Sequence, residues 1–482
     1  MRNKYSHIIE NVSTKEDAYN KIYEYLKKNF FVEEEKFPYE KDALLLDLLG
    51  SGDCKSRAFY MIYVMRALGI PVAFDYSPVW ANYGTNSHSW PVLVTNNDNV
   101  ITGIHDKEHI IDGTYEPFKY TFSQLDYPYT VDSLKKISKI YRKCFNHVIK
   151  RKDVSSPLSF LSPFDKDVTN QYPNLTDNGI VEIDHFTFSS LYLCTFKQQE
   201  GWTPISRVTK RMFNTVDIGG LIHDCLIIIG KNSDGIITPV SQPYIISHNN
   251  KPRLLKPVEG QKQTVKLYRK YMLGNRWTNR WSDFIGTRIE TSNDRSFKKD
   301  CSLLYVSKNL PKEKIRIPIN KEKLKRYIRV LPMEGKYPVF AEIALYKDSK
   351  QQIDESNFKI FSIGKGLTGD TLVTKSLIDG NEETTFYKQF PFWIGLDINN
   401  CHSDIYNIEF ILWNDYNRII PGHEYELFYF DKKWISLGVK KATNEYLEYE
   451  DVPIGCLFLL RNYVCGKEER VFTYENDKQI WW

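Results

Sequence analysis

The segment Ser51–Pro71 constrains this chain more than any other, because it specifies a helix together with both of its ends. Gly52 and Asp53 supply a turn and an N-cap. Behind them, apolar residues recur at helical spacing; they are Ala58, Met61, Ile62, Met65 and Leu68. Gly69 is the expected C-cap, and Pro71 prevents the helix from continuing. The sequence therefore predicts an amphipathic helix that begins beside Cys54.

The position of Cys54 suits a nucleophile. In the first turn of a helix, unpaired backbone N–H groups and the positive end of the helix dipole favour a thiolate. Lys55 and Arg57 add positive charge on the same turn. A cysteine behind an apolar stripe is more often a small core residue, so the assignment depends on partners elsewhere in the chain.

Two later segments supply such partners. The run Ser87–Val94 has the alternation of a strand and carries His88 on the same face as its tryptophan. The short run His109–Thr114 carries Asp112 at a strand end. A cysteine on a helix, followed by a histidine and an aspartate on strands, is the arrangement of a nucleophile, a general base and an orienting acid. We therefore predict a catalytic triad.

These motifs resemble the transglutaminase-like superfamily. The residues that carry the resemblance are G-D-C-x-x-x-A from Gly52, R-A-L-G-I-P from Arg66, H-x-W from His88 and I-D-G-T from Ile111. The resemblance covers roughly residues 20–120, and the chain as a whole resembles multidomain Bacteroidetes-type proteins that join such a core to C-terminal β-sandwiches. It implies a papain-like core in which Cys54 is the nucleophile, His88 the base and Asp112 the residue that orients the imidazole.

The chain departs from the family pattern after the histidine. Pro91 and Val92 follow H-x-W, where many members have a polar or acidic residue. An insertion rich in Asn and Asp separates His88 from Asp112 and leaves Asp98 and Asp106 as weaker rivals for the third position.

The oxyanion donors also differ from a papain-type site. No Gln or Trp closely precedes Cys54, so its own backbone N–H is the best donor candidate. Asn82 or Asn86 is the expected second donor. Together with Trp80 and Trp90, these two asparagines are the predicted substrate-binding residues.

Bulk properties narrow the class of protein. A chain of 482 residues is expected to form two to four domains. Its net charge of +5 is small for this length and does not predict nucleic-acid binding. The eight cysteines are scattered without a C-x-x-C pair, which indicates free thiols rather than a zinc site, a redox dithiol or a disulfide framework. The proposed chemistry requires no cofactor.

The apolar runs are too short to span a bilayer, so no transmembrane segment is predicted. The first residues lack the apolar segment of a secretory signal. A cytoplasmic protein and a truncated secreted or periplasmic one both fit these observations. The oligomeric state is left open.

The predicted fold class is α+β, with a papain-like transglutaminase core followed by antiparallel β-sandwich domains. We expect helices over residues 14–30, 39–49 and 132–147 in a first domain, residues 1–155. Alternation of period two predicts a small antiparallel β domain over 156–260. Residues 261–482 are expected to form a sandwich region, with a division into two parts near residue 350 as an alternative.

The last region is similar to a discoidin-like (galactose-binding-like) sandwich. The resemblance rests on the segments 290–294, 326–330, 341–343, 378–384, 393–397 and 425–429. Such sandwiches bind glycans or peptides through end loops, and the candidate contacts are Trp413, Asn414, Asp415, Tyr416 and Arg418. Ordinary turn chemistry explains the same loop equally well. Asp379 and Glu382 could hold a structural Ca²⁺, but an Asx turn accounts for them too, and no metal site is predicted.

The sequence predicts two candidate functions. The first is a thiol hydrolase or acyltransferase that acts on peptide or carboxamide bonds through a thioester, hydrolysis being favoured because no amine-acceptor site is evident. Its substrate would be a peptide, a protein or a glycopeptide. The alternative is a catalytically inactive glycan- or peptide-binding protein on the same scaffold.

Overall fold

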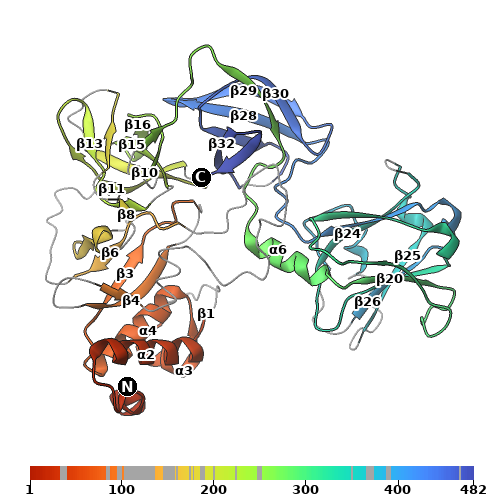
Figure 1. Ribbon diagram of the computed structural model, residues 1–482, viewed down its shortest axis with the longest axis horizontal. Helices are drawn as coiled ribbons and strands as arrows, with labels where there is room; N and C mark the ends of the chain where they lie inside the picture. Colours follow the sequence, from red (N-terminus) through yellow and green to blue (C-terminus); the bar gives the residue numbers. More distant parts are fainter. Residues whose placement is uncertain are drawn as a thin grey trace. The chain divides into compact units, whose positions relative to one another are not determined.

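The computed structural model describes residues 1–32, 41–82, 87–94, 100–102, 136–144, 158, 161–172, 175–176, 179–184, 190–198, 201–222, 225–246, 252–348, 351–364, 374–386, 392–465 and 468–482. The regular secondary structure of these residues is mainly strands in antiparallel sheets, with few helices (Figure 1). The chain divides into two compact units. The first holds the described residues up to Met272 together with Ile419–Trp482, and the second holds Leu273–Arg418.

The N-terminal part of the first unit packs helices against a sheet. The helices are α1 (Arg2–Tyr5), α2 (Lys15–Asn29), α3 (Ala43–Leu49) and α4 (Cys54–Ala67). The sheet has the order β5-β4-β3-β6-β7, with β3 (Val72–Ser77), β4 (His88–Val94), β5 (Val100–Thr102), β6 (Tyr141–Lys143) and β7 (Asp165–Asp167). A short parallel pair joins β1 (Phe31–Val32) to β2 (Ser51–Gly52), immediately before Cys54.

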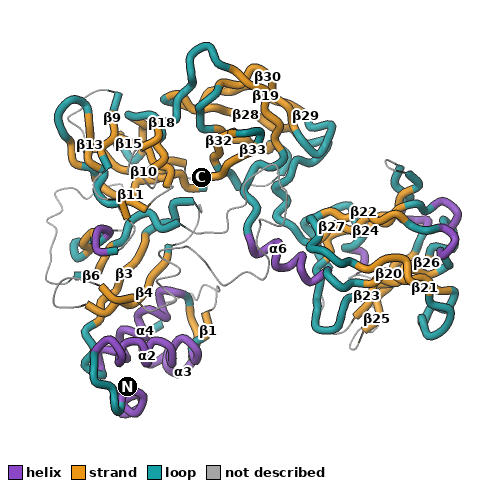
Figure 2. The backbone as a smooth tube through the Cα atoms, viewed as in Figure 1, coloured by secondary structure: helices purple, strands orange, loops and turns teal. Residues whose placement is uncertain are grey.

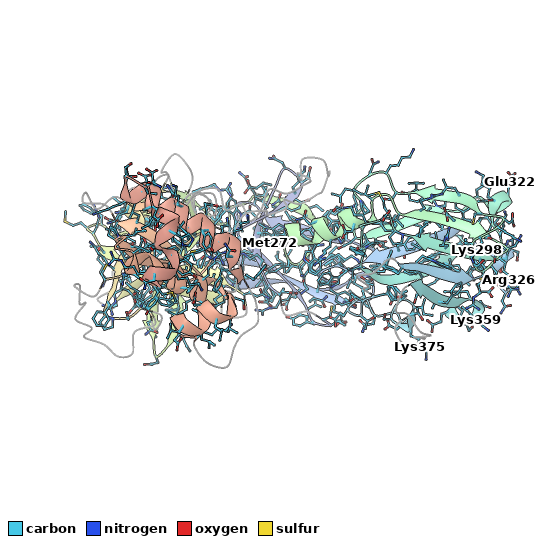
Figure 3. All side chains as sticks on the ribbon, turned by 90° about the horizontal axis from the view of Figure 1, so that it is seen from below. Met272, Lys298, Glu322, Arg326, Lys359 and Lys375 are labelled. Carbon is cyan, nitrogen blue, oxygen red and sulfur yellow. The ribbon has the colours of Figure 1, made fainter. Side chains whose placement is uncertain are left out.

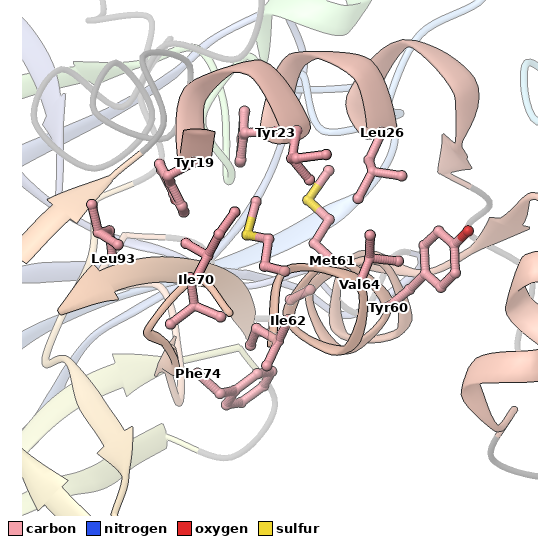
Figure 4. Packing of buried hydrophobic residues seen from close by; sticks show 14 of the residues in the cluster. Tyr19, Tyr23, Leu26, Tyr60, Met61, Ile62, Val64, Ile70, Phe74 and Leu93 are labelled. Carbon is pink, nitrogen blue, oxygen red and sulfur yellow. The ribbon is translucent and has the colours of Figure 1, made fainter. Parts of the chain in front are cut away.

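Local signals explain these helices. Thr14 caps α2 by accepting a hydrogen bond from the Asp17 amide at 3.0 Å. One face of α2 then packs on α4 and the sheet (Figure 4); the buried residues include Tyr19, Ile22, Tyr23, Leu26, Met61, Val64, Met65, Phe74 and Leu93. Helix α3 begins at Ala43 behind the cap Asp42, later than the predicted start at residue 39; residues 33–40 lie outside the described residues.

Helix α4 has the predicted start and ends one residue earlier than expected. Its last residue is Ala67 and its C-cap is Leu68, one residue before the expected cap Gly69, which has φ of +83°. The Gly69 amide donates to the Arg66 carbonyl, and the Ile70 amide donates to the Met65 carbonyl, both at 3.0 Å. These two bonds form a Schellman motif, in which glycine tolerates the left-handed conformation.

The helix predicted over 132–147 is wrong within its described part. Residues 141–143 form strand β6, which pairs with both β3 and β7. The apolar residues Ile137 and Ile140 fit a helical spacing, yet both are buried in the cluster beneath β3 and β4. Because tertiary pairing with β3 satisfies the backbone of this segment, it overrides the local pattern.

A second group of sheets in the first unit confirms the antiparallel β character predicted for 156–260. Its main sheet has the order β11-β10-β15-β17-β18, and β16 pairs with β15. These strands are β10 (Leu191–Lys197), β11 (Gly201–Arg207), β15 (Cys225–Ser233), β16 (Ile236–Pro239), β17 (Tyr244–Ile246) and β18 (Pro252–Leu254). Smaller sheets join β9 (Ile180–Glu182), β12 (Thr209–Lys210) and β13 (Thr215–Asp217), and β8 (Leu175–Thr176) with β14 (Leu221–Ile222).

The C-terminal strands complete the first unit. They form the sheet β29-β28-β31-β32-β33 and the pair β19-β30. Their bounds are β19 (Lys262–Leu267), β28 (Glu424–Asp431), β29 (Lys433–Lys441), β30 (Leu447–Pro453), β31 (Phe458–Asn462), β32 (Val471–Glu475) and β33 (Lys478–Trp481). The buried Arg470 guanidinium donates to the carbonyls of Phe196 and Ala81 at 2.5 and 2.7 Å, fastening this sheet to the rest of the unit.

The second unit consists of two antiparallel sheets in separate layers (Figure 2). One sheet has the order β21-β20-β23-β26-β25 and the other β22-β27-β24. The elements are α6 (Asn275–Trp281), β20 (Arg288–Ser292), β21 (Ser302–Val306), β22 (Lys314–Pro318), β23 (Tyr327–Leu331), β24 (Phe340–Tyr346), β25 (Lys359–Gly364), β26 (Phe392–Asp397) and β27 (Asn407–Leu412). Lys298, Arg326 and Lys359 project from one end of these layers (Figure 3).

This arrangement differs from the predicted region 261–482. Strand β19, at the start of that region, pairs with β30 nearly two hundred residues later, so both belong to the first unit. The chain crosses between units at Met272 and Arg418 rather than near residue 350. Residue 350 itself falls between β24 and β25, inside the second unit.

Candidate functional site

Cys54 occupies the first position of α4. Asp53 caps this helix, its carboxylate accepting a hydrogen bond from the Ser56 amide at 2.7 Å. The Cys54 sulfur lies 4.0 Å from the carbonyl oxygen of Ser87. The same sulfur accepts a hydrogen bond from the Ser89 amide. The thiol therefore contacts the backbone on both sides of His88.

The protonation of Cys54 does not follow the sequence-based expectation of a favoured thiolate. Burial raises the pKa of the Cys54 thiol, and the negative charge of Asp53 raises it further. The Ser89 amide, the Arg57 charge and the Lys55 amide oppose this increase without overcoming it. Since tertiary burial outweighs the helix terminus, an isolated Cys54 thiol stays protonated at neutral pH.

The His88 ring is held between two indoles. The Trp80 ring centroid is 5.4 Å from the imidazole at an interplanar angle of 24°, and the Trp90 centroid is 5.5 Å away at 30°. His88 is 6% exposed, at the start of β4 opposite Ser77 of β3. This stacking fixes the plane of the imidazole beside the backbone that Cys54 contacts.

A buried polar network holds Trp90 in turn. The Trp90 indole N–H donates to the Tyr172 hydroxyl at 3.0 Å, and that hydroxyl donates to Asp75 at 2.5 Å. The Arg142 guanidinium donates two bonds to the same carboxylate, at 2.7 and 2.8 Å. Burial raises the pKa of Asp75, and the Arg142 charge opposes that shift.

No sequence motif singled out Asp75, Arg142 or Tyr172 as site residues. An aspartate inside the otherwise apolar run of β3 was the available signal, since a carboxylate without exposure needs a partner. Its partners lie 67 and 97 residues away along the chain, so local spacing did not reveal them.

The residues predicted to bind substrate are buried where the structure describes them. Trp80, Asn82 and Trp90 are 5%, 1% and 1% exposed. The Asn82 side-chain oxygen accepts a hydrogen bond from the Lys136 amide at 2.7 Å, which fixes the segment leading into β6. Asn86, Asp112 and the rivals Asp98 and Asp106 lie outside the described residues.

The loop Trp413–Arg418 of the second unit shows the turn chemistry that the sequence offered as an alternative. The Asn414 side chain accepts from the Tyr416 amide at 2.7 Å, and the Asp415 carboxylate accepts from the Asn417 amide at 3.2 Å. The Trp413 ring packs edge-on against Trp277, with centroids 4.7 Å apart. A ligand-binding role for Trp413, Asn414, Asp415, Tyr416 and Arg418 stays a prediction.

Carboxylates beside this loop pair with one another and with arginine. Glu382 accepts a hydrogen bond from Arg418, and Asp379 accepts from the Asn381 amide at 2.9 Å. Burial and the neighbouring Asp379 raise the pKa of Glu342 to about 8. Within the described part of the chain, no group of three or more His, Cys, Asp or Glu side chains is arranged to hold a metal ion.

Comparison with known families finds a similarity in the N-terminal part of the chain. Residues 3–99 match the transglutaminase-like superfamily. The match confirms that resemblance over α2, α3, α4, β3 and β4, and it includes Cys54 and His88. The multidomain Bacteroidetes type and the discoidin-like resemblance stay predictions. No curated protein matches the chain, and no helix among its described residues has the length and apolar character needed to cross a membrane.

Proposed function

We propose that the N-terminal part of this protein is a thiol hydrolase or acyltransferase with Cys54 as its nucleophile and His88 as its general base. The observation that carries the proposal is the contact of the Cys54 sulfur with the backbone of Ser87 and Ser89, on either side of His88. The superfamily match over residues 3–99 supports the same pairing.

The raised pKa of Cys54 determines how the nucleophile would be activated. Because the thiol is protonated at rest, His88 takes its proton as the sulfur attacks the carbonyl carbon of a peptide or carboxamide. The new C–S bond gives a tetrahedral intermediate, which collapses to a thioester as the C–N bond breaks. The leaving amine takes the proton from the imidazolium.

Water then resolves the thioester. His88 accepts a proton from water as its oxygen attacks, and the Cys54 thiolate leaves and regains that proton. The backbone N–H of Cys54, in the first turn of α4, is available to stabilise the oxyanion of both steps. Asp112 is the proposed orienting acid, and Asn82 or Asn86 the proposed second donor.

A binding protein without catalysis is the second candidate function. Two observations favour it: burial raises the pKa of Cys54, and His88 is 6% exposed between two indoles. In this case the β-sheets of the second unit would hold a glycan or a peptide. The loop Trp413–Arg418 would make the contacts.

Alkylation by iodoacetamide separates the two functions. Cys144 is a matched internal reference, since it is also partly buried and burial also raises the pKa of its thiol. For an activated Cys54 we expect faster alkylation than at Cys144 near pH 7. The variant His88→Phe, which keeps an aromatic ring between the indoles, should remove that advantage.

A substrate assay completes the test. Release of ammonia from glutamine-containing peptides, or of a new amino terminus from longer ones, should require Cys54 and His88. If Cys54 is no more reactive than Cys144, or if His88→Phe leaves its reactivity intact, the enzyme assignment fails and glycan or peptide binding becomes the better explanation.

A further inference from the structure

A second cysteine has a histidine within contact distance. The Cys465 sulfur lies 3.4 Å from Nδ1 of His423; His423 immediately precedes β28 and Cys465 follows β31, both strands of the first unit. Asn462, at the end of β31, donates its side-chain N–H toward the same sulfur at 3.4 Å. Cys465 and His423 are both partly exposed, and Tyr463 and Val464 beside them are 55% and 57% exposed.

Backbone hydrogen bonds fix the orientation of the Asn462 amide. Its side-chain oxygen accepts from the Val464 amide at 2.8 Å and from the Cys465 amide at 3.2 Å. Since the oxygen is used in this way, the NH₂ group must face the sulfur and the imidazole, whose Nδ1 is 3.3 Å from it. The turn therefore aims an N–H donor at Cys465.

The backbone around His423 is equally fixed. Its amide donates to the Ile420 carbonyl at 3.2 Å, and its carbonyl accepts from the Ala442 amide at 2.9 Å. The Tyr463 amide donates to the Glu424 carbonyl at 3.0 Å, which joins the turn of Cys465 to the start of β28. The thiol and the imidazole are therefore held together by main-chain bonds on both sides.

This arrangement brings the sulfur and Nδ1 close enough for a proton transfer between them. In the neutral pair the S–H donates to Nδ1. In the ion pair the imidazolium N–H and the Asn462 N–H both donate to the thiolate, which two donors stabilise better than one. A cysteine beside such a histidine is more reactive than a free one.

The charged side chains described near Cys465 and His423 have partners of their own. Glu424 lies opposite Lys441 in the register of β28 and β29, and Glu426 accepts hydrogen bonds from Ser436 and Tyr463. Arg461, on β31, is bound to Glu469 at 2.6 Å. Among the described residues, these carboxylates and cations are engaged with other groups, and the His423 imidazole lies in contact with the Cys465 sulfur.

The remaining thiols give the contrast. Burial raises the pKa of five of them: Cys54, Cys144, Cys194, Cys401 and Cys456. Cys301 is exposed and donates its S–H to the Phe297 carbonyl at 3.2 Å. A carbonyl cannot take the thiol proton, whereas the imidazole beside Cys465 can.

We propose that Cys465 is a modification site that forms a mixed disulfide with low-molecular-weight disulfides, with His423 as its base. The thiolate attacks one sulfur of the disulfide, a new S–S bond forms and the old one breaks. The departing thiolate carries away the electron pair and takes the proton from the His423 imidazolium. The incoming disulfide is the oxidant, so the exchange is balanced.

The test uses the full chain and oxidised glutathione, with the modification at each cysteine followed by peptide mass spectrometry. Each unit by which an ion pair lowers a thiol pKa raises the thiolate fraction about tenfold and costs roughly threefold in nucleophilicity. At pH 6.5 we therefore expect Cys465 to react at least about threefold faster than the exposed Cys301.

Two variants remove the activation and leave the turn intact. His423→Gln keeps the backbone bonds but has no base. Asn462→Asp keeps the oxygen that caps the Val464 and Cys465 amides but places a negative charge in place of the N–H donor. Both should bring Cys465 to the rate of Cys301 at pH 6.5.

Unchanged amide hydrogen exchange in peptides covering β28 and β31, together with an unchanged thermal unfolding midpoint, would show that the variants are folded. The wild-type measurement tests the proposal even without them. Equal rates at Cys465 and Cys301 would overturn it, as would a His423→Gln variant that reacts as fast as the wild type.

Discussion

Replacing Tyr172 by phenylalanine tests whether the network beneath His88 holds the site together. The hydroxyl donates to the Asp75 carboxylate at 2.5 Å and accepts from the Trp90 indole at 3.0 Å. Both partners are at most 1% exposed. Tyr172→Phe therefore removes one bond to a charged group and leaves a buried N–H without its acceptor.

The expected cost follows from these two losses. A hydrogen bond to a charged group contributes about 1.5–3 kcal/mol, and an orphaned buried donor costs about 1–3 kcal/mol. Together we expect a loss of roughly 3–5 kcal/mol in the free energy of the opening that exposes β4. Tyr19→Phe is the matched control, because it removes one neutral bond, from the Tyr19 hydroxyl to the Pro91 carbonyl at 2.8 Å, on the same strand. Its cost should be about 1 kcal/mol.

Amide hydrogen exchange measures this locally, which matters because a chain of two units need not unfold in one step. In peptides covering β3 and β4, Tyr172→Phe should accelerate exchange by roughly a hundredfold or more, since about 1.4 kcal/mol corresponds to a factor of ten. Tyr19→Phe should accelerate it by roughly a factor of five. If the two variants exchange alike, the reasoning that the Tyr172 bonds stabilise the site is refuted.

Three further predictions follow from single contacts. Asp53→Ala removes a charge that raises the pKa of Cys54, so the rate of Cys54 alkylation at neutral pH should increase. Loss of the helix cap should cost about 1 kcal/mol of stability at the same time. An unchanged pH–rate profile of alkylation would contradict this prediction. Glu342 has a pKa of about 8 in the folded protein against about 4.3 in an unfolded chain, so the second unit should lose stability as the pH rises through this window. In melting curves, Glu342→Gln should reduce the dependence of the unfolding midpoint on pH. A variant whose midpoint depends on pH as steeply as that of the wild type would disprove this prediction. A Cβ on Gly395 would overlap the Phe361 ring. Gly395→Ala should therefore destabilise the second unit by about 1–3 kcal/mol, measured by urea unfolding. An unchanged free energy of unfolding would contradict this prediction.

The parts of the site that were predictable from the sequence are those with local signals. Asp53 caps α4 as expected, and the alternation through β4 places Trp90 and Val92 in one buried cluster. Caps and alternation act over a few residues, so a single sequence displays them. The family match over residues 3–99 includes both Cys54 and His88, and their pairing as nucleophile and base stays a proposal.

The parts that the sequence missed depend on distant pairing. Residues 141–143 had a plausible helical pattern, but β6 exists because β3 and β7 bind it on both sides. The division of the chain has the same origin, since β19 pairs with β30 across the whole second unit. Local propensity is a weak predictor wherever backbone groups find partners far away in the chain.

The two cysteine–histidine arrangements differ in the exposure and hydrogen bonding of their sulfur atoms. At Cys54 the helix terminus favours a thiolate, yet burial raises the thiol pKa, so in the proposed mechanism His88 takes the proton during attack. At Cys465 the thiol is partly exposed, and His423 and Asn462 already face the sulfur. A protonated, shielded thiol suits a carbonyl substrate that fits beside it, whereas an open thiol with a resident base suits a small disulfide from solution. The surroundings of each sulfur, more than its place on a helix or in a turn, therefore determine the electrophile with which we expect it to react.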